Sequence, residues 1–431
     1  MATLSNLPRN VWLFIAFRIC FNVRFYYPVF AILFLDYGLT IEQFAITNVV
    51  WAIAIVACEV PSGALADLIG RKRLLVMASM LMVVEMVLLI VLPLGNNTLV
   101  FAVILLNRVL SGIAEALASG ADEALAYDSF TEAEREKRWP EVLAKLTRWQ
   151  SIGFFFAMMF GALLYDAGWM NKLLSWSGFS CTSEDALRFP IYATLVTAIL
   201  AFISTISMKE LSSLCPSQRA SVREAYQQIW NAAGWAFKMP IVVVIILFAL
   251  LHDSIARLFY TLGSQYYRLI EYPEAVFGVI GSCIAVLGII TASLGKWLIG
   301  RFSLKWNMLV VTLAMLFGFL GLSFAIPYWG ILFMIPLAIG FSLVSFFVSH
   351  YLNKEVDSKH RATVLSFKGL ALNLGFGVLS LVYMILLEVL KRQDMTAEED
   401  QVFAASLYGF LPLLLVAAGI FYSWAGKKVK K

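Results

Sequence analysis

Charged and polar side chains recur at helical spacing inside long apolar stretches of this sequence. An ionisable group in such a stretch costs at least about 2.5 kcal/mol unless it is paired or hydrated, so each is a functional candidate. Arg108, Ser111, Glu115, Ser119 and Asp122 follow one another at steps of three and four residues, which places them on one helical face. The pattern predicts a water-lined path. The alternative is that Arg108 and Glu115 pair separately with neighbouring helices and serve only structure.

A second apolar stretch carries Asp253, Arg257, Tyr260 and Ser264 on one face, with His252 beside them. Two interpretations stay open for Asp253 and Arg257, which are four residues apart. They neutralise each other within the helix, or the pair opens when a substrate or a proton arrives. A histidine at such a position is more often packed than a proton shuttle.

The first apolar stretch holds Arg18, Asn22 and Arg24, which cannot all face one cavity if the helix is continuous. We favour Arg24 as the cavity residue, because Tyr27 and its aromatic neighbours follow directly and provide cation–π partners. Arg18 is then expected to neutralise Glu59 or Glu85.

The composition excludes an ordinary soluble protein. Of the 431 residues, 61% are hydrophobic and 14% are charged, against about a quarter charged in soluble domains. The formal charge of +5 comes without a basic patch in a soluble segment, so no nucleic-acid partner is expected. The sequence shows no paired nucleophile and base, no metal-like cysteine spacing and no phosphate-binding glycine loop. We therefore expect neither an enzyme nor a cofactor or bound metal.

The apolar runs predict an all-α membrane protein with twelve transmembrane helices, each run being long enough to cross about 30 Å of hydrocarbon. Their expected ranges are Val11–Asp36, Ile41–Ala66, Leu74–Leu94, Leu99–Ala121, Thr147–Tyr165, Pro190–Met208, Ile241–Ser264, Ala275–Ile299, Asn307–Ile326, Gly330–Leu352, Ala362–Leu387 and Val402–Ala425. Residues 209–240 are polar and amphipathic, so we expect a cytoplasmic linker between a six-helix domain at 1–208 and another at 241–431. The repeated segment LIGR, at Leu68 and again at Leu298, favours two related halves.

Most of the 33 lysines and arginines fall in segments that are cytoplasmic if both chain ends are cytoplasmic. An even number of spans agrees with that orientation. We expect a multi-pass protein of a bacterial cytoplasmic (inner) membrane.

The segment GALADLIGRKRLL, from Gly63 to Leu75, forms a short polar connection between two apolar runs. It resembles the loop signature G-x-L-A-D-R-x-G-R-K-x-x-L of the major facilitator superfamily, with Leu68 at the position where that family usually has a basic residue. The segment from Arg361, reading RATVLS, is similar to a sequence that precedes the eleventh helix in bacterial members. The resemblance implies a cytoplasmic gate, and the candidate residues are Gly63, Asp67, Gly70, Arg71, Asp122, Asp128 and Arg361.

The same resemblance implies alternating access of two six-helix halves around a central cavity. Candidate substrate or proton residues are Arg24, Tyr27, Arg108, Glu115, His252, Asp253 and Arg257. The function we expect is proton-coupled export of small amphiphilic organic molecules by a monomer in the lipid bilayer. Two alternatives stay open. One is a carrier for an organic anion or zwitterion, which three cavity arginines favour; the other is a membrane scaffold or receptor that transports nothing.

Overall fold

A computed structural model describes residues 7–95, 97–175, 180–210, 227, 234, 238–356 and 358–428 of the chain. All regular elements in these ranges are helical, as predicted. The first group of elements is α1 (Arg9–Asn22), η2 (Tyr27–Val29), α2 (Phe30–Asp36), α3 (Ile41–Ile69), α4 (Arg71–Val91), α5 (Asn97–Ala118), α6 (Ala121–Tyr127), α7 (Glu132–Tyr165), α8 (Ala167–Leu174) and α9 (Ser183–Ser207). The second group is α11 (Pro240–Thr261), α12 (Gly263–Leu269), α13 (Glu274–Arg301), α14 (Leu304–Leu322), η5 (Trp329–Phe333), α15 (Met334–Glu355), α16 (Ser358–Gln393) and α17 (Glu399–Lys428).

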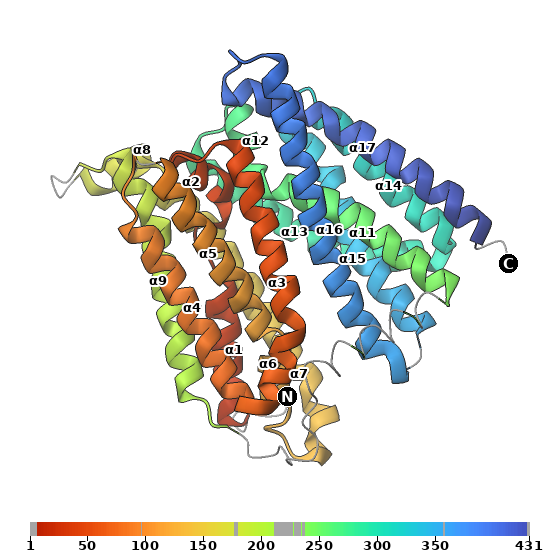
Figure 1. Cartoon of the computed structure of the whole chain (residues 1–431). Coiled ribbons are helices and arrows are strands. Elements are labelled where there is room, and N and C mark those ends of the chain that lie inside the picture. Colours follow the sequence, from red (N-terminus) through yellow and green to blue (C-terminus); the bar gives the residue numbers. More distant parts are fainter. Residues whose placement is uncertain are drawn as a thin grey trace.

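The two groups lie side by side (Figure 1). We call α1 to α9 the N-group and α11 to α17 the C-group. They touch mainly where α7 packs on α13 and where α3 packs on α16. In Figure 1 the groups converge at the end that carries α8 and α12, called the α12 end, and diverge toward the end that carries α6, called the α6 end.

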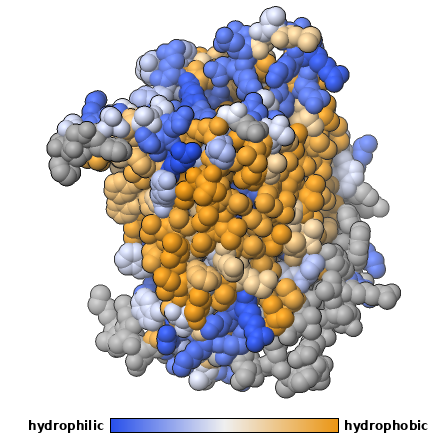
Figure 2. Space-filling model, turned by 60° about the vertical axis from the view of Figure 1, so that its left-hand side comes forward, coloured by the Kyte–Doolittle hydropathy of each residue, from blue (hydrophilic) through white to orange (hydrophobic). Residues whose placement is uncertain are grey.

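An apolar belt covers the face shown in Figure 2, with hydrophilic residues above and below it. By length and composition, the described residues include 11 helices able to cross a membrane, or up to 12 if the bent pair Arg138–Tyr165 and Ala167–Leu174 forms one span. A belt of this kind is what a hydrocarbon environment requires of the surface of a spanning bundle. The predicted fold class is therefore confirmed.

The first predicted helix, Val11–Asp36, is wrong in one respect: it is not continuous. Regular helix stops at Asn22 and resumes at Phe30, and Pro28 in the intervening segment has no N–H to donate. Two threonines of α9 bond the freed backbone: Thr194 Oγ1 accepts from Phe25 N at 3.0 Å, and Thr197 Oγ1 donates to Val23 O at 3.2 Å. Arg24 thus lies in a break between two half-helices.

Other boundaries differ by less. Helix α7 begins at Glu132, so the charged segment before Thr147 is a helical extension of the predicted span. Helix α11 ends at Thr261, and the chain turns into α12 before Ser264. Most of residues 209–240 lie outside the described residues, and the predicted domain limits stay a prediction.

Candidate functional site

A cavity of about 490 Å³ lies between the two groups. This volume is in the range of small-molecule sites. Both groups contribute charged and aromatic side chains, among them Arg24, Tyr26, Tyr27, Phe30, Asn48, Trp51, Arg108, Ser111 and Glu115 from the N-group and Arg257, Tyr260, Ser264, Tyr267, Phe341 and Phe376 from the C-group. Four predicted cavity residues of the N-group, Arg24, Tyr27, Arg108 and Glu115, therefore come together here.

Arg24 is the centre of a buried ion network at this cavity. Its guanidinium lies 3.3 Å from Glu85 Oε2 and 3.3 Å from Glu115 Oε1, and it donates to the Tyr26 hydroxyl at 3.0 Å. The Arg24 and Glu85 side chains are 2% and 1% exposed, whereas Glu115 keeps 29% of its surface exposed. Glu115 is thus the carboxylate that the cavity can reach. The expectation that Arg18 neutralises Glu85 is wrong, since Arg24 does so.

Arg108 is placed differently from Arg24. It lines the cavity at 7% exposure, and its guanidinium carbon lies 5.4 Å from the Phe30 ring centroid and 5.5 Å from that of Trp51. Such contacts stabilise a cation through the ring quadrupole. Gly112 brings α5 against α3, because a Cβ there would meet the Trp51 carbonyl oxygen at 2.9 Å.

The C-group wall carries Arg257, whose guanidinium lies 2.6 Å from Asp253 Oδ2 and donates to Asn373 Oδ1 at 3.0 Å. Arg257 lines the cavity, whereas Asp253 contacts Arg257 from behind this lining. The pairing predicted from their spacing is present. His252 is not a cavity residue: its ring is fully buried, with nitrogens bonded to Phe248 O at 2.9 Å and Thr312 Oγ1 at 2.8 Å.

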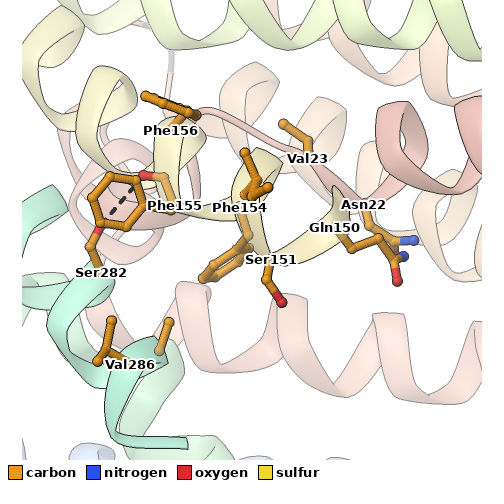
Figure 3. A pocket seen from close by; sticks show the side chains of 11 residues that line it. Asn22, Val23, Gln150, Ser151, Phe154, Phe155, Phe156, Ser282 and Val286 are labelled. Atoms are coloured by element: carbon orange, nitrogen blue, oxygen red, sulfur yellow. Dashed lines mark hydrogen bonds between the residues drawn. The ribbon is translucent and has the colours of Figure 1, made fainter. Parts of the chain in front are cut away.

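A second cavity, of about 500 Å³, adjoins the first at Phe154 and Ala285 and lies between α1, α7 and α13 (Figure 3). Its walls are mostly apolar. Ser282 Oγ donates to the Phe155 carbonyl oxygen across it at 3.3 Å, and none of the described residues that line it is charged. The groups able to bind a proton or an ionic solute belong to the first cavity, which we take as the candidate site.

The N-group and C-group are joined at the α12 end by an ion network that the sequence analysis missed. Arg268 of α12 donates to both Asp36 oxygens at 2.8 and 2.7 Å and lies 2.6 Å from Glu274. Burial disfavours the charged guanidinium, but these carboxylates outweigh it and raise the pKa of Arg268 above its ordinary value. Tyr165 also donates to Asp36 at 2.5 Å. The sequence feature that could have indicated this network is Asp36, an isolated acidic residue at the end of an apolar run.

Closer to the cavity, Ser264 Oγ accepts hydrogen bonds from the backbone nitrogens of Ala31 at 3.0 Å and Ile32 at 3.2 Å. Ser264 itself lines the cavity. These bonds tie α12 to α2, so they join the N-group and the C-group beside the cavity.

At the α6 end, two of the candidate gate residues form an ion pair. Arg71 pairs with Asp128, which Arg135 also approaches at 3.3 Å. Asp122 pairs with Arg18 at 2.8 Å, which corrects the predicted pairing of Arg18 with Glu59 or Glu85. The side chains of Asp67 and Arg361 lie outside the described part of the structure.

The two gate glycines differ in their constraints. Gly70 is the turn between α3 and α4, with φ of +95°, a conformation that favours glycine. Gly63 lies inside α3, and a Cβ there would meet no atom of the described residues within 4 Å.

Comparison with known proteins gives one family. The family model described as Major Facilitator Superfamily matches residues 12–380. No curated protein sequence matches the chain.

Solved transporter structures share the fold at low identity. A mutant of the nucleoside transporter NupG is 14% identical with a TM-score of 0.74, over 97% of this chain and 99% of its own. A bacterial homolog of the human lysosomal transporter Spinster, inward-facing and unoccupied, is 14% identical with a TM-score of 0.70, over 99% of both chains. The POT family transporter PepTSo is 13% identical with a TM-score of 0.68, also over 99% of both chains.

Proposed function

This chain belongs to the major facilitator superfamily, and from that premise we propose a proton-coupled exporter of small amphiphilic organic molecules. As a member of that family it is a secondary transporter and not an enzyme. The observation that carries the proton coupling is the Arg24 network, in which one cation stands between two carboxylates.

With Glu85 and Glu115 both ionised, the three groups carry one net negative charge in a buried site. Uptake of one proton makes this three-group network neutral and leaves Arg108, the other charged N-group residue that lines the cavity, as the uncompensated charge. Glu115 is the accessible carboxylate, so it is the proposed proton acceptor. One proton moving down 100 mV supplies about 2.3 kcal/mol, enough to hold a solute gradient of about 50-fold.

The arrangement of the two groups supports alternating access. Ion pairs and hydrogen bonds join them at the α12 end, whereas their ribbons diverge toward the α6 end (Figure 1). The Lys and Arg bias of the sequence supports a cytoplasmic α6 end. We accordingly propose that this is the inward-facing state of a monomer in a bacterial inner membrane, with Arg268 and Asp36 as the exterior gate.

The cavity walls support an amphiphilic solute. Aromatic side chains form much of the lining, and a small number of charged groups stand among them. Such walls bind an apolar body through buried area and fix its orientation through a few polar contacts. The fold alone selects no solute, since the structures that share it include a nucleoside transporter and a POT family transporter.

Replacing Glu115 with glutamine tests the coupling. In efflux-deficient cells expressing the protein, a panel of fluorescent lipophilic cations and anions should accumulate less than in vector controls, and a protonophore should abolish the difference. Glu115→Gln should abolish it too, because the network can no longer exchange its proton at the accessible site. The matched control is Glu388→Gln on α16, a carboxylate 52% exposed and paired only loosely with Arg392 at 3.9 Å. Protonophore-sensitive export by Glu115→Gln at the wild-type level would refute the assignment.

A further inference from the structure

Three polar groups of residues that line the central cavity have no hydrogen-bond partner among the described residues. They are Nε of Arg108, both amide atoms of Asn48 and the hydroxyl of Tyr260. Asn48 is 1% exposed and Arg108 is 7% exposed, so bulk water satisfies neither side chain. Buried polar groups in proteins are bonded in the great majority of cases. Unsatisfied groups on the wall of one cavity therefore indicate a ligand with matching polar atoms.

Arg108 also differs in charge balance from the other two cavity arginines. Carboxylates lie 3.3 Å from the Arg24 guanidinium and 2.6 Å from that of Arg257. In the part of the chain that the structure describes, Arg108 has no such ion pair, and its near contacts are the Phe30 and Trp51 rings. Arg108 is thus the cavity cation that is free to receive an anion.

Asn48 lines the same cavity as this cation and lies on α3 with Trp51. It comes about one helical turn before Trp51 on α3, so the two share a face, and Arg108 lies over Trp51. The Asn48 amide offers two N–H donors, and the planar guanidinium offers a fork of donors that matches the two oxygens of a carboxylate. The Phe376 ring lies 6.1 Å from that of Trp51 and extends the apolar wall.

We propose that the site binds an organic carboxylate, with the carboxylate on Arg108 and Asn48 and an apolar body against Phe30, Trp51 and Phe376. The carboxylate proposal narrows the substrate class of the proposed exporter, and it rests on the proposed export function. A phosphate monoester fits less well, because a dianion calls for a second free cation and Arg24 and Arg257 are already paired. Tyr260, on the C-group, would meet a polar atom elsewhere on the same solute and so link the two groups through it.

Direct binding tests the proposal without requiring transport. The full chain, purified in detergent, is titrated calorimetrically with naphthalene-2-carboxylate, naphthalene-2-carboxamide and 2-naphthyl phosphate, and with decanoate and decanamide. We expect each carboxylate to bind about 10- to 100-fold more tightly than its amide, as for a charge-assisted bidentate contact. We expect the phosphate to bind more weakly than naphthalene-2-carboxylate.

Three variants test whether Arg108 and Asn48 cause the preference for carboxylate over amide. Arg108→Gln should remove the preference for carboxylate over amide, and Arg108→Lys should keep part of it, since charge remains but the fork is lost. Asn48→Asp should weaken carboxylate binding by like-charge repulsion. The control is Arg301→Gln, which removes another arginine stacked on a tryptophan, Trp297 at 5.0 Å, but outside the cavity. Thermal unfolding of each ligand-free variant separates loss of binding from loss of fold.

The proposal is overturned if no carboxylate binds, if amides bind equally well, if the phosphate binds most tightly, or if folded Arg108→Gln keeps the preference. Carboxylate binding without protonophore-sensitive transport would instead refute the proposed coupling and leave this inference standing. Proton-driven export of dyes without carboxylate binding would refute this inference and leave the proposed coupling standing.

Discussion

Arg24→Gln is expected to destabilise the protein by about 3–5 kcal/mol and to abolish transport. The substitution leaves Glu85, 1% exposed, without its cation, and removing one partner of a buried ion pair costs about that much. Glu115 loses the same partner. Thermal unfolding in detergent and uptake into proteoliposomes measure the two effects separately.

A second substitution separates charge from packing. Glu85→Gln added to Arg24→Gln removes the uncompensated carboxylate, so most of the lost stability should return while transport stays absent. The control is Arg392→Gln, whose side chain is 82% exposed and whose ion pair is worth less than about 1 kcal/mol. A single Arg24→Gln variant as stable as wild type would mean that Glu85 is neutral or finds another partner.

The proposed proton site and anion site share helix α5, which explains how they could communicate. Arg108 and Glu115 are seven residues apart, two helical turns or about 10 Å along the axis. In the low dielectric of a partly closed cavity, a charge change on Glu115 alters the potential at Arg108. Protonation would then change anion affinity without any long-range structural relay.

Helical periodicity was enough to predict the parts of the site that lie on one helix. Arg108, Ser111 and Glu115 do share the cavity face of α5. Asp253 and Arg257 do pair across one turn of α11. These relations depend only on a rise and a rotation per residue, which the sequence specifies once a helix is recognised.

Relations between helices were not predictable in the same way. Pro28 and the threonines of α9 break the first helix, so Arg24 turns toward Glu85 of α4 instead of following a continuous helical face. Arg18 then pairs with Asp122, because Gly120, with φ of +76°, redirects the chain into α6. The ion-pair partner of each arginine depends on where the charged residues of neighbouring helices lie. The spacing of residues within one helix carries no information about those positions.

The same limit applies to closure at the α12 end, where Asp36 and Arg268 are far apart in the sequence. Their contact requires α7 and α13 to approach closely on the same side of the cavity. Gly278 permits this approach, since a Cβ there would lie 2.2 Å from the carbonyl oxygen of Met158. Backbone on the partner helix cannot move aside as a flexible side chain could.

Gly278→Ala is accordingly expected to separate α7 from α13 and to shift the transporter away from the state closed at the α12 end. Overpacking costs about 1–3 kcal/mol, or about 5- to 150-fold in the population of that state. The measurement is the distance between spin labels at Leu173→Cys on α8 and Met395→Cys after α16, both exposed, with the five native cysteines replaced. The distribution should move to longer distances, and transport should fall with it.

Gly288→Ala is the matched control on the same helix. A Cβ there would lie 3.9 Å from the nearest atom, Ser342 Oγ, which is ordinary van der Waals contact. Alanine is a better helix former than glycine, so this variant should keep the wild-type distances and unfold at the same temperature or higher. If Gly278→Ala also keeps the wild-type distances, the close approach of α7 and α13 does not control closure, and the ion network of Arg268 and the hydrogen bonds to Ser264 must hold the α12 end.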